Sequence, residues 1–195
     1  KWSDEDKTTA DVLIQAYYTA ERQMDFVFVA DCSNSMAGIG NTYDMNSKFY
    51  DMQSKLLDVT EQLLTTPGYD CKVAYATFGE SESSDSKFYG RTELSNAQDF
   101  VTNDIVDYKS NTNYSIRLAQ ALELVKNNQG RNTTVIFISD GQPYGGPTTP
   151  DSYYGIEEAA AIKAAGVQII GVLQSVADSE EETATENMQA ICDNV

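Results

Sequence analysis

Oxygen-bearing side chains follow one apolar run of this sequence at alternate positions. The run covers residues 26–30, and Asp31, Ser33 and Ser35 come directly after it. Carboxylate and hydroxyl oxygens are hard ligands that suit magnesium, manganese or calcium, whereas zinc and copper prefer imidazole or thiolate. A second apolar run, residues 135–139, also ends at a carboxylate, Asp140. This pattern predicts a divalent-cation site, with magnesium as the first choice, if the fold brings the two run ends together.

The composition excludes several classes of function. The chain of 195 residues contains no histidine, which excludes serine and cysteine hydrolases that depend on a histidine base. Its 30 acidic and 13 basic residues give a net charge of −17. Such a charge argues against nucleic acid as a partner and against direct contact with an anionic membrane.

Alternating strand and helix patterns predict an α/β fold. Because four apolar runs alternate with amphipathic segments, we expect a doubly wound, mostly parallel sheet with helices on both faces. The link before residues 87–91 is short, which predicts one short antiparallel edge strand there. The other predicted strands are residues 26–30, 72–78, 135–139 and 167–173, and the predicted helices are residues 48–65, 95–106, 114–128, 156–165 and 181–194.

The first 23 residues precede this pattern. Residues 12–18 form an apolar stretch that predicts a strand, and the segment 1–23 is therefore a β-rich extension to a domain spanning 24–195. This extra strand belongs either to the edge of the sheet or to a neighbouring domain.

Ligands bind at the carboxyl ends of strands in such sheets, so Asp31 and Asp140 should lie at one edge. Thr112 precedes the predicted helix at 114–128 and should lie at that edge too. Together with Asp31, Ser33 and Ser35, these residues resemble the metal-ion-dependent adhesion site of von Willebrand factor type A domains, which have a Rossmann-like fold.

The resemblance implies a role for each ligand. Ser33 and Ser35 would bind the ion directly, Thr112 directly or through water, and Asp31 and Asp140 mainly through water. Family members commonly have glycine between the two serines and before the threonine, where this chain has asparagine. The departure changes the stiffness of the loops but removes no ligand oxygen.

The resemblance also implies a non-enzymatic adhesion function. A partner protein would supply an acidic side chain to the ion. The order of the opening residues, the β-rich stretch and the metal loop resembles surface and pilus-tip adhesins of Gram-positive bacteria. We therefore expect an extracellular domain on the bacterial cell surface, covalently part of a larger surface protein or pilus and binding host matrix such as collagen or fibronectin. In this reading residues 12–18 are a strand of an immunoglobulin-like carrier, and the domain lacks its last strand.

Two other functions are alternatives. In the first, the chain is a structural or assembly module whose ion only stiffens the loops. In the second, it is a magnesium-dependent phosphatase of the haloacid dehalogenase type, but that chemistry requires a second carboxylate two residues after the first, where this chain has Ser33.

Aromatic and cysteine residues add two further hypotheses. Five tyrosines fall near the predicted metal edge and form either a protein-binding rim or ordinary packing: Tyr43, Tyr114, Tyr144, Tyr153 and Tyr154. Cys71 and Cys192 are both expected at the opposite edge, where a disulfide would leave Cys32 free. Three buried, unpaired cysteines are the equal alternative.

Overall fold

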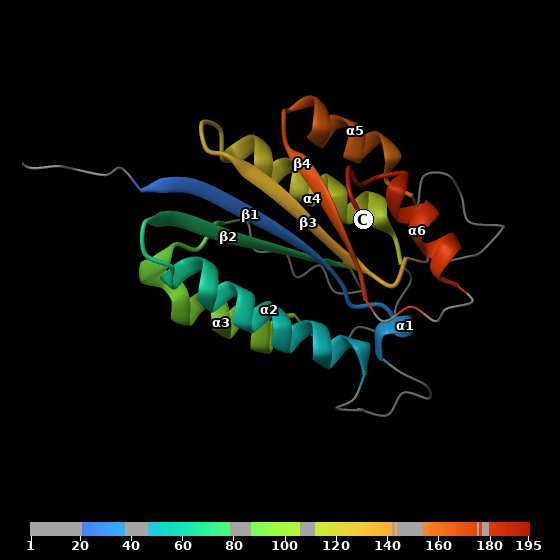
Figure 1. The fold of residues 1–195 in the computed structure, drawn as a ribbon, viewed down its shortest axis with the longest axis horizontal. Coiled ribbons are helices and arrows are strands. Elements are labelled where there is room, and N and C mark those ends of the chain that lie inside the picture. Colours follow the sequence, from blue (N-terminus) through green and yellow to red (C-terminus); the bar gives the residue numbers. More distant parts are fainter. Residues whose placement is uncertain are drawn as a thin grey trace, which may run out of the picture.

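The computed structural model describes residues 21–37, 47–78, 87–105, 112–141, 143, 154–174, 176 and 180–195. Within these residues four parallel strands form one sheet in the order β2-β1-β3-β4, with helices on both faces (Figure 1). The predicted doubly wound α/β fold is confirmed. The elements are β1 (Arg22–Asp31), α1 (Asn34–Ala37), α2 (Lys48–Thr65), β2 (Tyr69–Phe78), a 3-10 turn (Arg91–Glu93), α3 (Leu94–Asn103), α4 (Tyr114–Asn127), β3 (Thr133–Ser139), α5 (Ile156–Ala164), β4 (Gln168–Leu173) and α6 (Glu181–Gln189).

The central strand β1 is buried on both faces over most of its length, which explains why its residues 26–30 are apolar without alternation. On β1, Val27 and Val29 face one core with helices α4, α5 and α6. Phe28 and Ala30 face the other core with α2 and α3. Two hydrophobic layers therefore hold β1 at the centre of the molecule.

Helix α2 illustrates how the local sequence defines an element. Its buried side chains recur at the three- and four-residue spacing of one helix face, as with Phe49, Met52 and Leu56. The hydroxyl of Ser47 caps the helix by accepting a hydrogen bond from the Tyr50 backbone at 3.4 Å. The predicted helix over 48–65 is confirmed at both ends.

The order of the strands sets the edge of the sheet at which the predicted ligands lie. The chain passes from β1 to β2 on one side and then crosses to β3 on the other side of β1. The direction of winding therefore reverses between β1 and β3, and ligands bind at the carboxyl ends of such a pair. Asp31 ends β1 and Asp140 follows β3.

The predicted antiparallel strand at 87–91 is wrong in its extent. Only Tyr89 pairs in this way within the described residues, exchanging backbone hydrogen bonds of 2.9 and 2.7 Å with Val73. The 3-10 turn begins at Arg91, whose guanidinium donates to the carbonyls of Leu64 and Thr66 at the end of α2. This anchor turns the chain away from the sheet after one residue pair.

The remaining predictions about the ends of the domain stay predictions. The proposed carrier strand at 12–18 lies outside the described residues. At the outer edge of β4, Asn194 forms a parallel bridge with Ile170. In the described part of the chain, none of the helices has the length and apolar character that crossing a membrane requires.

The predicted disulfide between Cys71 and Cys192 is not formed. Both cysteines are free and buried, and so is Cys32. Cys71 lies on β2, whereas the sulfur of Cys192 packs against Gly171 of β4 at the opposite side of the sheet. Because β1 and β3 separate those strands by about 14 Å in total, the cysteines exceed the reach of a disulfide.

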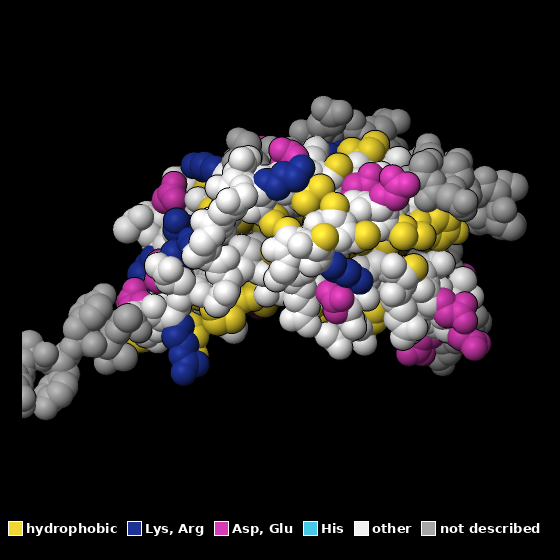
Figure 2. All heavy atoms as spheres, turned by 90° about the horizontal axis from the view of Figure 1, so that it is seen from above, with side chains coloured by type: hydrophobic (Ala, Val, Ile, Leu, Met, Phe, Trp, Pro, Cys, Tyr) yellow, Lys and Arg dark blue, Asp and Glu magenta, His cyan; other side chains and the backbone are white. Residues whose placement is uncertain are grey.

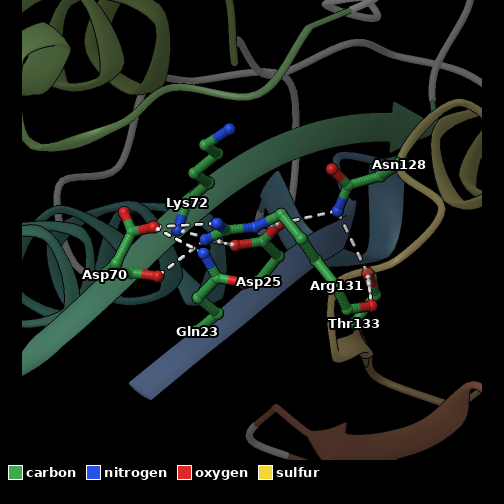
Figure 3. A network of polar contacts seen from close by, with 7 residues as sticks. All are labelled: Gln23, Asp25, Asp70, Lys72, Asn128, Arg131 and Thr133. Carbon is green, nitrogen blue, oxygen red and sulfur yellow. Dashed lines mark hydrogen bonds and ion pairs between the residues drawn. The ribbon is translucent and has the colours of Figure 1, made fainter. Parts of the chain in front are cut away.

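A buried ion pair joins three strands at the edge where they begin (Figure 3). Arg131 donates to both carboxylate oxygens of Asp25 at 2.6 and 2.7 Å and to the Asp70 carboxylate at 2.8 Å. Asn128 donates to Asp25 at 2.6 Å and to the Thr133 hydroxyl at 3.2 Å. The side chain of Asp25 is fully buried, so its charge depends on these partners.

We expect Arg131→Met to destabilise the protein by roughly 3 kcal/mol, because it leaves the buried Asp25 carboxylate without its cation. Urea unfolding would measure the change. Lys126→Met is the matched control, since Lys126 forms an exposed pair with Glu123, and we expect it to cost less than about 1 kcal/mol. Equal effects of the two substitutions would contradict a structural role for the Arg131 network.

Candidate metal site

Asp31 is held rigidly at the end of β1. Its carboxylate is fully buried. One oxygen accepts a hydrogen bond from the backbone N–H of Ser33 at 2.8 Å. The other accepts from the hydroxyl of Ser139, on β3, at 2.6 Å. The carboxylate is therefore fixed by its own loop and by the neighbouring strand.

The loop after Asp31 brings two hydroxyls together. The Ser33 and Ser35 hydroxyl oxygens lie 3.1 Å apart, and Ser33 is buried whereas Ser35 is exposed. The carbonyl of Ser33 accepts from the backbone N–H of Met36 at 3.0 Å, and the buried Met36 side chain anchors the loop in the core. Cys32, between the ligands predicted here, also packs in that core.

Asp140 presents a carboxylate oxygen that the protein leaves unsatisfied. Oδ2 lies 3.4 Å from the ammonium of Lys48. Oδ1 is buried and has no hydrogen-bond partner among the described residues. A buried carboxylate oxygen without a hydrogen-bond partner is costly and calls for an explanation. A bound cation would satisfy it.

Thr112 enters the site with the first turn of α4. It is buried, and the Asn113 side chain caps the helix by accepting from the Ile116 backbone at 3.4 Å. Two residues after Thr112, the hydroxyl of Tyr114 lies 2.9 Å from the Ser139 hydroxyl. This contact holds the start of α4 at the carboxyl end of β3. All five predicted ligands therefore lie at the same edge of the sheet.

Ser139 is a residue of the site that the sequence alone did not reveal. Its only proton goes to Asp31, so its oxygen accepts from the Tyr114 hydroxyl and from the Gly141 backbone at 3.1 Å. Ser139 thus links β1, α4 and the loop after β3. Its place as the one polar residue of the run 135–139 was the available signal.

The predicted tyrosine rim is wrong for Tyr114. Its side chain is fully buried and packs edge-on against Phe137, with 4.8 Å between the ring centroids. Tyr154 is half-buried just before α5. The other three members, Tyr43, Tyr144 and Tyr153, lie outside the described residues.

Electrostatics at the site favour a positive ligand. Burial, and then the nearby charge of Asp140, raises the pKa of Asp31 from 3.8 to about 7, against the opposing hydrogen bonds from Ser139 and Ser33. In the described residues no group of three or more carboxylate, imidazole or thiolate side chains is arranged so that it could hold a metal ion. A metal ion here would therefore need the hydroxyls of Ser33, Ser35 and Thr112.

The loop that carries Asp140 also rests on α6. Gly141 has a left-handed backbone, with φ of +83°, and a Cβ at this position would lie 2.4 Å from the Cβ of Ala184. Asn187 donates to the Gly141 carbonyl at 2.9 Å. The site loop and α6 are thus in direct contact.

Comparisons with known proteins agree with this architecture. A model of the von Willebrand factor type A domain family matches residues 25–194. No curated protein sequence matches the chain.

Three solved structures share the fold. The PilB minor pilin from Streptococcus sanguinis aligns with a TM-score of 0.64 and 14% identity, over 92% of this chain and 58% of that chain. The open pilus adhesin SpaC from Lactobacillus rhamnosus GG aligns with a TM-score of 0.64 and 18% identity, over 88% and 27%. The vWF domain of the type V pili tip protein Mfa5 from Porphyromonas gingivalis aligns with a TM-score of 0.63 and 13% identity, over 89% and 88%.

This chain thus spans about a quarter of SpaC and somewhat over half of PilB. At these identities the structural likeness establishes the fold alone.

The raised pKa of Asp31 predicts how the stability of the metal-free protein depends on pH. Because the folded state holds this proton more tightly than the unfolded chain, the contribution is complete below pH 3.8 and is lost as the pH rises through about 7. Thermal unfolding in chelator between pH 5 and pH 8 should show a falling midpoint. Asp51 and Asp70, whose pKa values are lowered by Lys55 and Arg131, titrate in a more acidic range.

We expect Asp31→Asn to remove most of this dependence, since the amide cannot ionise, and to leave the metal-free protein more stable near pH 8. Asp58→Asn, a change of an exposed residue on α2, should behave like the wild type. A falling midpoint of the same size in Asp31→Asn would contradict the assignment.

Substitution of two glycines with similar positive φ values allows the cost of backbone strain to be measured separately from the cost of a clash with α6. Gly130 has φ of +89° and nothing within 4 Å of an added Cβ, whereas an alanine at Gly141 would collide with Ala184. We expect Gly130→Ala to cost about 1 kcal/mol in urea unfolding and Gly141→Ala clearly more. Equal costs of the two substitutions would show that α6 moves away from the loop carrying Asp140 and Gly141 without a measurable loss of stability.

Proposed function

We propose that this chain, which belongs to the von Willebrand factor type A domain family, binds a divalent metal ion and through it captures a carboxylate of a partner protein. The residues that would hold the ion are those predicted from the sequence: Asp31, Ser33, Ser35, Thr112 and Asp140. The single observation that carries the proposal is the buried Oδ1 of Asp140, which has no hydrogen-bond partner in the described part of the chain.

The spacing of the hydroxyls supports the choice of a small ion. An octahedral ion with bonds of about 2.1 Å separates neighbouring ligand oxygens by about 3 Å. The Ser33 and Ser35 oxygens lie 3.1 Å apart. Oxygen donors alone favour magnesium, with manganese and calcium as alternatives. The bound ion would supply a Lewis-acidic centre for a carboxylate from outside.

The negative charge of the metal-free site favours binding of a cation. Asp31 and Asp140 are buried close enough for their charges to repel. Acidic side chains also gather at this end of the molecule, where α5 and α6 begin (Figure 2). They include Glu157 and Glu158 on α5 and Glu181 and Glu182 on α6. Such a field concentrates cations near the site.

We propose further that the domain is an adhesion module of a bacterial surface protein. Two structures that share its fold are named as a pilus adhesin and a type V pili tip protein. In this proposal the chain is extracellular, is part of a larger surface protein or pilus, and binds host matrix proteins such as collagen or fibronectin. An assembly module in which the ion only stiffens the loops is the alternative to be separated by experiment.

Calorimetric titration with magnesium is expected to show one site, and Asp140→Asn and Ser33→Ala should each weaken binding at least about tenfold, because each removes an oxygen ligand or its charge. Thr102→Ala is the control, since the exposed Thr102 hydroxyl donates to the Gln98 carbonyl of its own helix, α3. Unchanged magnesium affinity in Asp140→Asn would overturn the metal site.

The same variants separate adhesion from assembly. Immobilised collagen and fibronectin should retain the wild-type domain in magnesium and release it in chelator, and should fail to retain Asp140→Asn. Retention that is unaffected by chelator would overturn the role of the ion in adhesion while leaving the metal site in place.

A further inference from the structure

Lys48 is the one cation paired with a carboxylate of the site within the described residues. It is the first residue of α2, and its ammonium reaches Asp140, which lies 92 residues away in the chain, at 3.4 Å. The lysine side chain is 31% exposed, whereas that of Asp140 is 6% exposed. A partly solvated positive charge therefore borders a buried negative one.

The stability of helix α2 does not account for a lysine at position 48. A cation in the first turn opposes the helix dipole, which favours negative charge there. Asp51 already supplies an acidic residue in that turn, and Ser47 supplies the cap. The position is thus mildly unfavourable for α2 itself, and the contact that Lys48 makes is with the candidate metal site.

The charges at the site show what Lys48 changes. A divalent ion would only cancel the two charges of Asp31 and Asp140. A neutral site at the acidic end of a protein with net charge −17 would attract a carboxylate poorly. With Lys48 included, the loaded site carries one net positive charge and becomes neutral when a carboxylate binds.

We propose that Lys48 is a specificity-determining residue of this site: its charge weakens binding of the divalent ion and strengthens binding of an acidic group to the loaded site. This inference rests on the proposed function. Both effects follow from one charge, because an ammonium repels the ion and attracts the carboxylate. A lysine with a merely structural role would not affect the two affinities in opposite directions.

The test measures the two affinities separately with simple probes. Binding of manganese alone is followed by the electron paramagnetic resonance signal of the free ion. Binding of acetate to the manganese-loaded domain is followed by broadening of the acetate methyl proton signal. Both are measured for the wild type, Lys48→Gln, Lys48→Ala and Lys48→Arg. Lys126→Gln is the matched control, because it removes one positive charge from an exposed pair on α4.

We expect Lys48→Gln and Lys48→Ala to bind manganese about three- to tenfold more tightly and acetate more weakly by a similar factor. Lys48→Arg and Lys126→Gln should stay within about twofold of the wild type. Manganese or acetate affinities that do not change in Lys48→Gln and Lys48→Ala, or that change in the same direction, would overturn the role of Lys48 while leaving the metal site intact. Absence of manganese binding to the wild type would instead overturn the proposed function.

Discussion

Two like charges, on Asp31 and Asp140, are buried at the point where the winding of the sheet reverses. Repulsion between them adds to the cost of burial, which is why the pKa of Asp31 is raised to about 7. The surrounding structure offsets this cost only in part. Ser139 and the Ser33 backbone donate hydrogen bonds to Asp31, and Lys48 approaches Asp140 from the solvent side. Within the part of the chain that the structure describes, the buried Oδ1 of Asp140 has no hydrogen-bond partner, and in our proposal a bound cation would supply one.

The two ends of β1 show how differently one strand can treat a buried carboxylate. At its beginning, Asp25 is neutralised by a bidentate Arg131 and further hydrogen bonds, all supplied by the protein (Figure 3). At its end, Asp31 has hydrogen-bond donors but pairs with none of the cationic side chains that the structure describes. A fully satisfied carboxylate serves stability, whereas a carboxylate with unmet charge is suited to binding. The same sheet therefore carries a structural edge and an edge at which we propose that a ligand binds.

The site is also connected to the helices on one face of the sheet. Tyr114 ties the start of α4 to Ser139, and the close contact of Gly141 with Ala184 ties the Asp140 loop to α6. Any ligand that moves these loops must act against packed side chains, because a core at crystal-like density has little free space. The position of α6 and the arrangement of the site are thus physically linked.

Residues that are neighbours in the chain were the ones that the sequence could place. The apolar runs, the helix at 48–65 and the carboxylates at the ends of strands depend on local periodicity, and the structure confirms them. Thr112 was predicted at the correct edge of the sheet. In a chain of alternating strands and helices, a helix begins near the edge at which the preceding strand ends. The length of the antiparallel strand at 87–91 was overestimated. Arg91 is held at the end of α2 by a contact between residues far apart in the chain, which local sequence patterns do not report.

The sequence by itself therefore determined the fold class and brought the five candidate ligands to one edge of the predicted sheet. Only the tertiary structure decided which groups surround them. The roles of Ser139 and Lys48, the burial of Tyr114 and the separation of Cys71 from Cys192 each depend on how elements distant in sequence pack together. Strand order sets these distances. Sequence periodicity reports which face of an element is buried, but it does not specify the side chains that the element meets there.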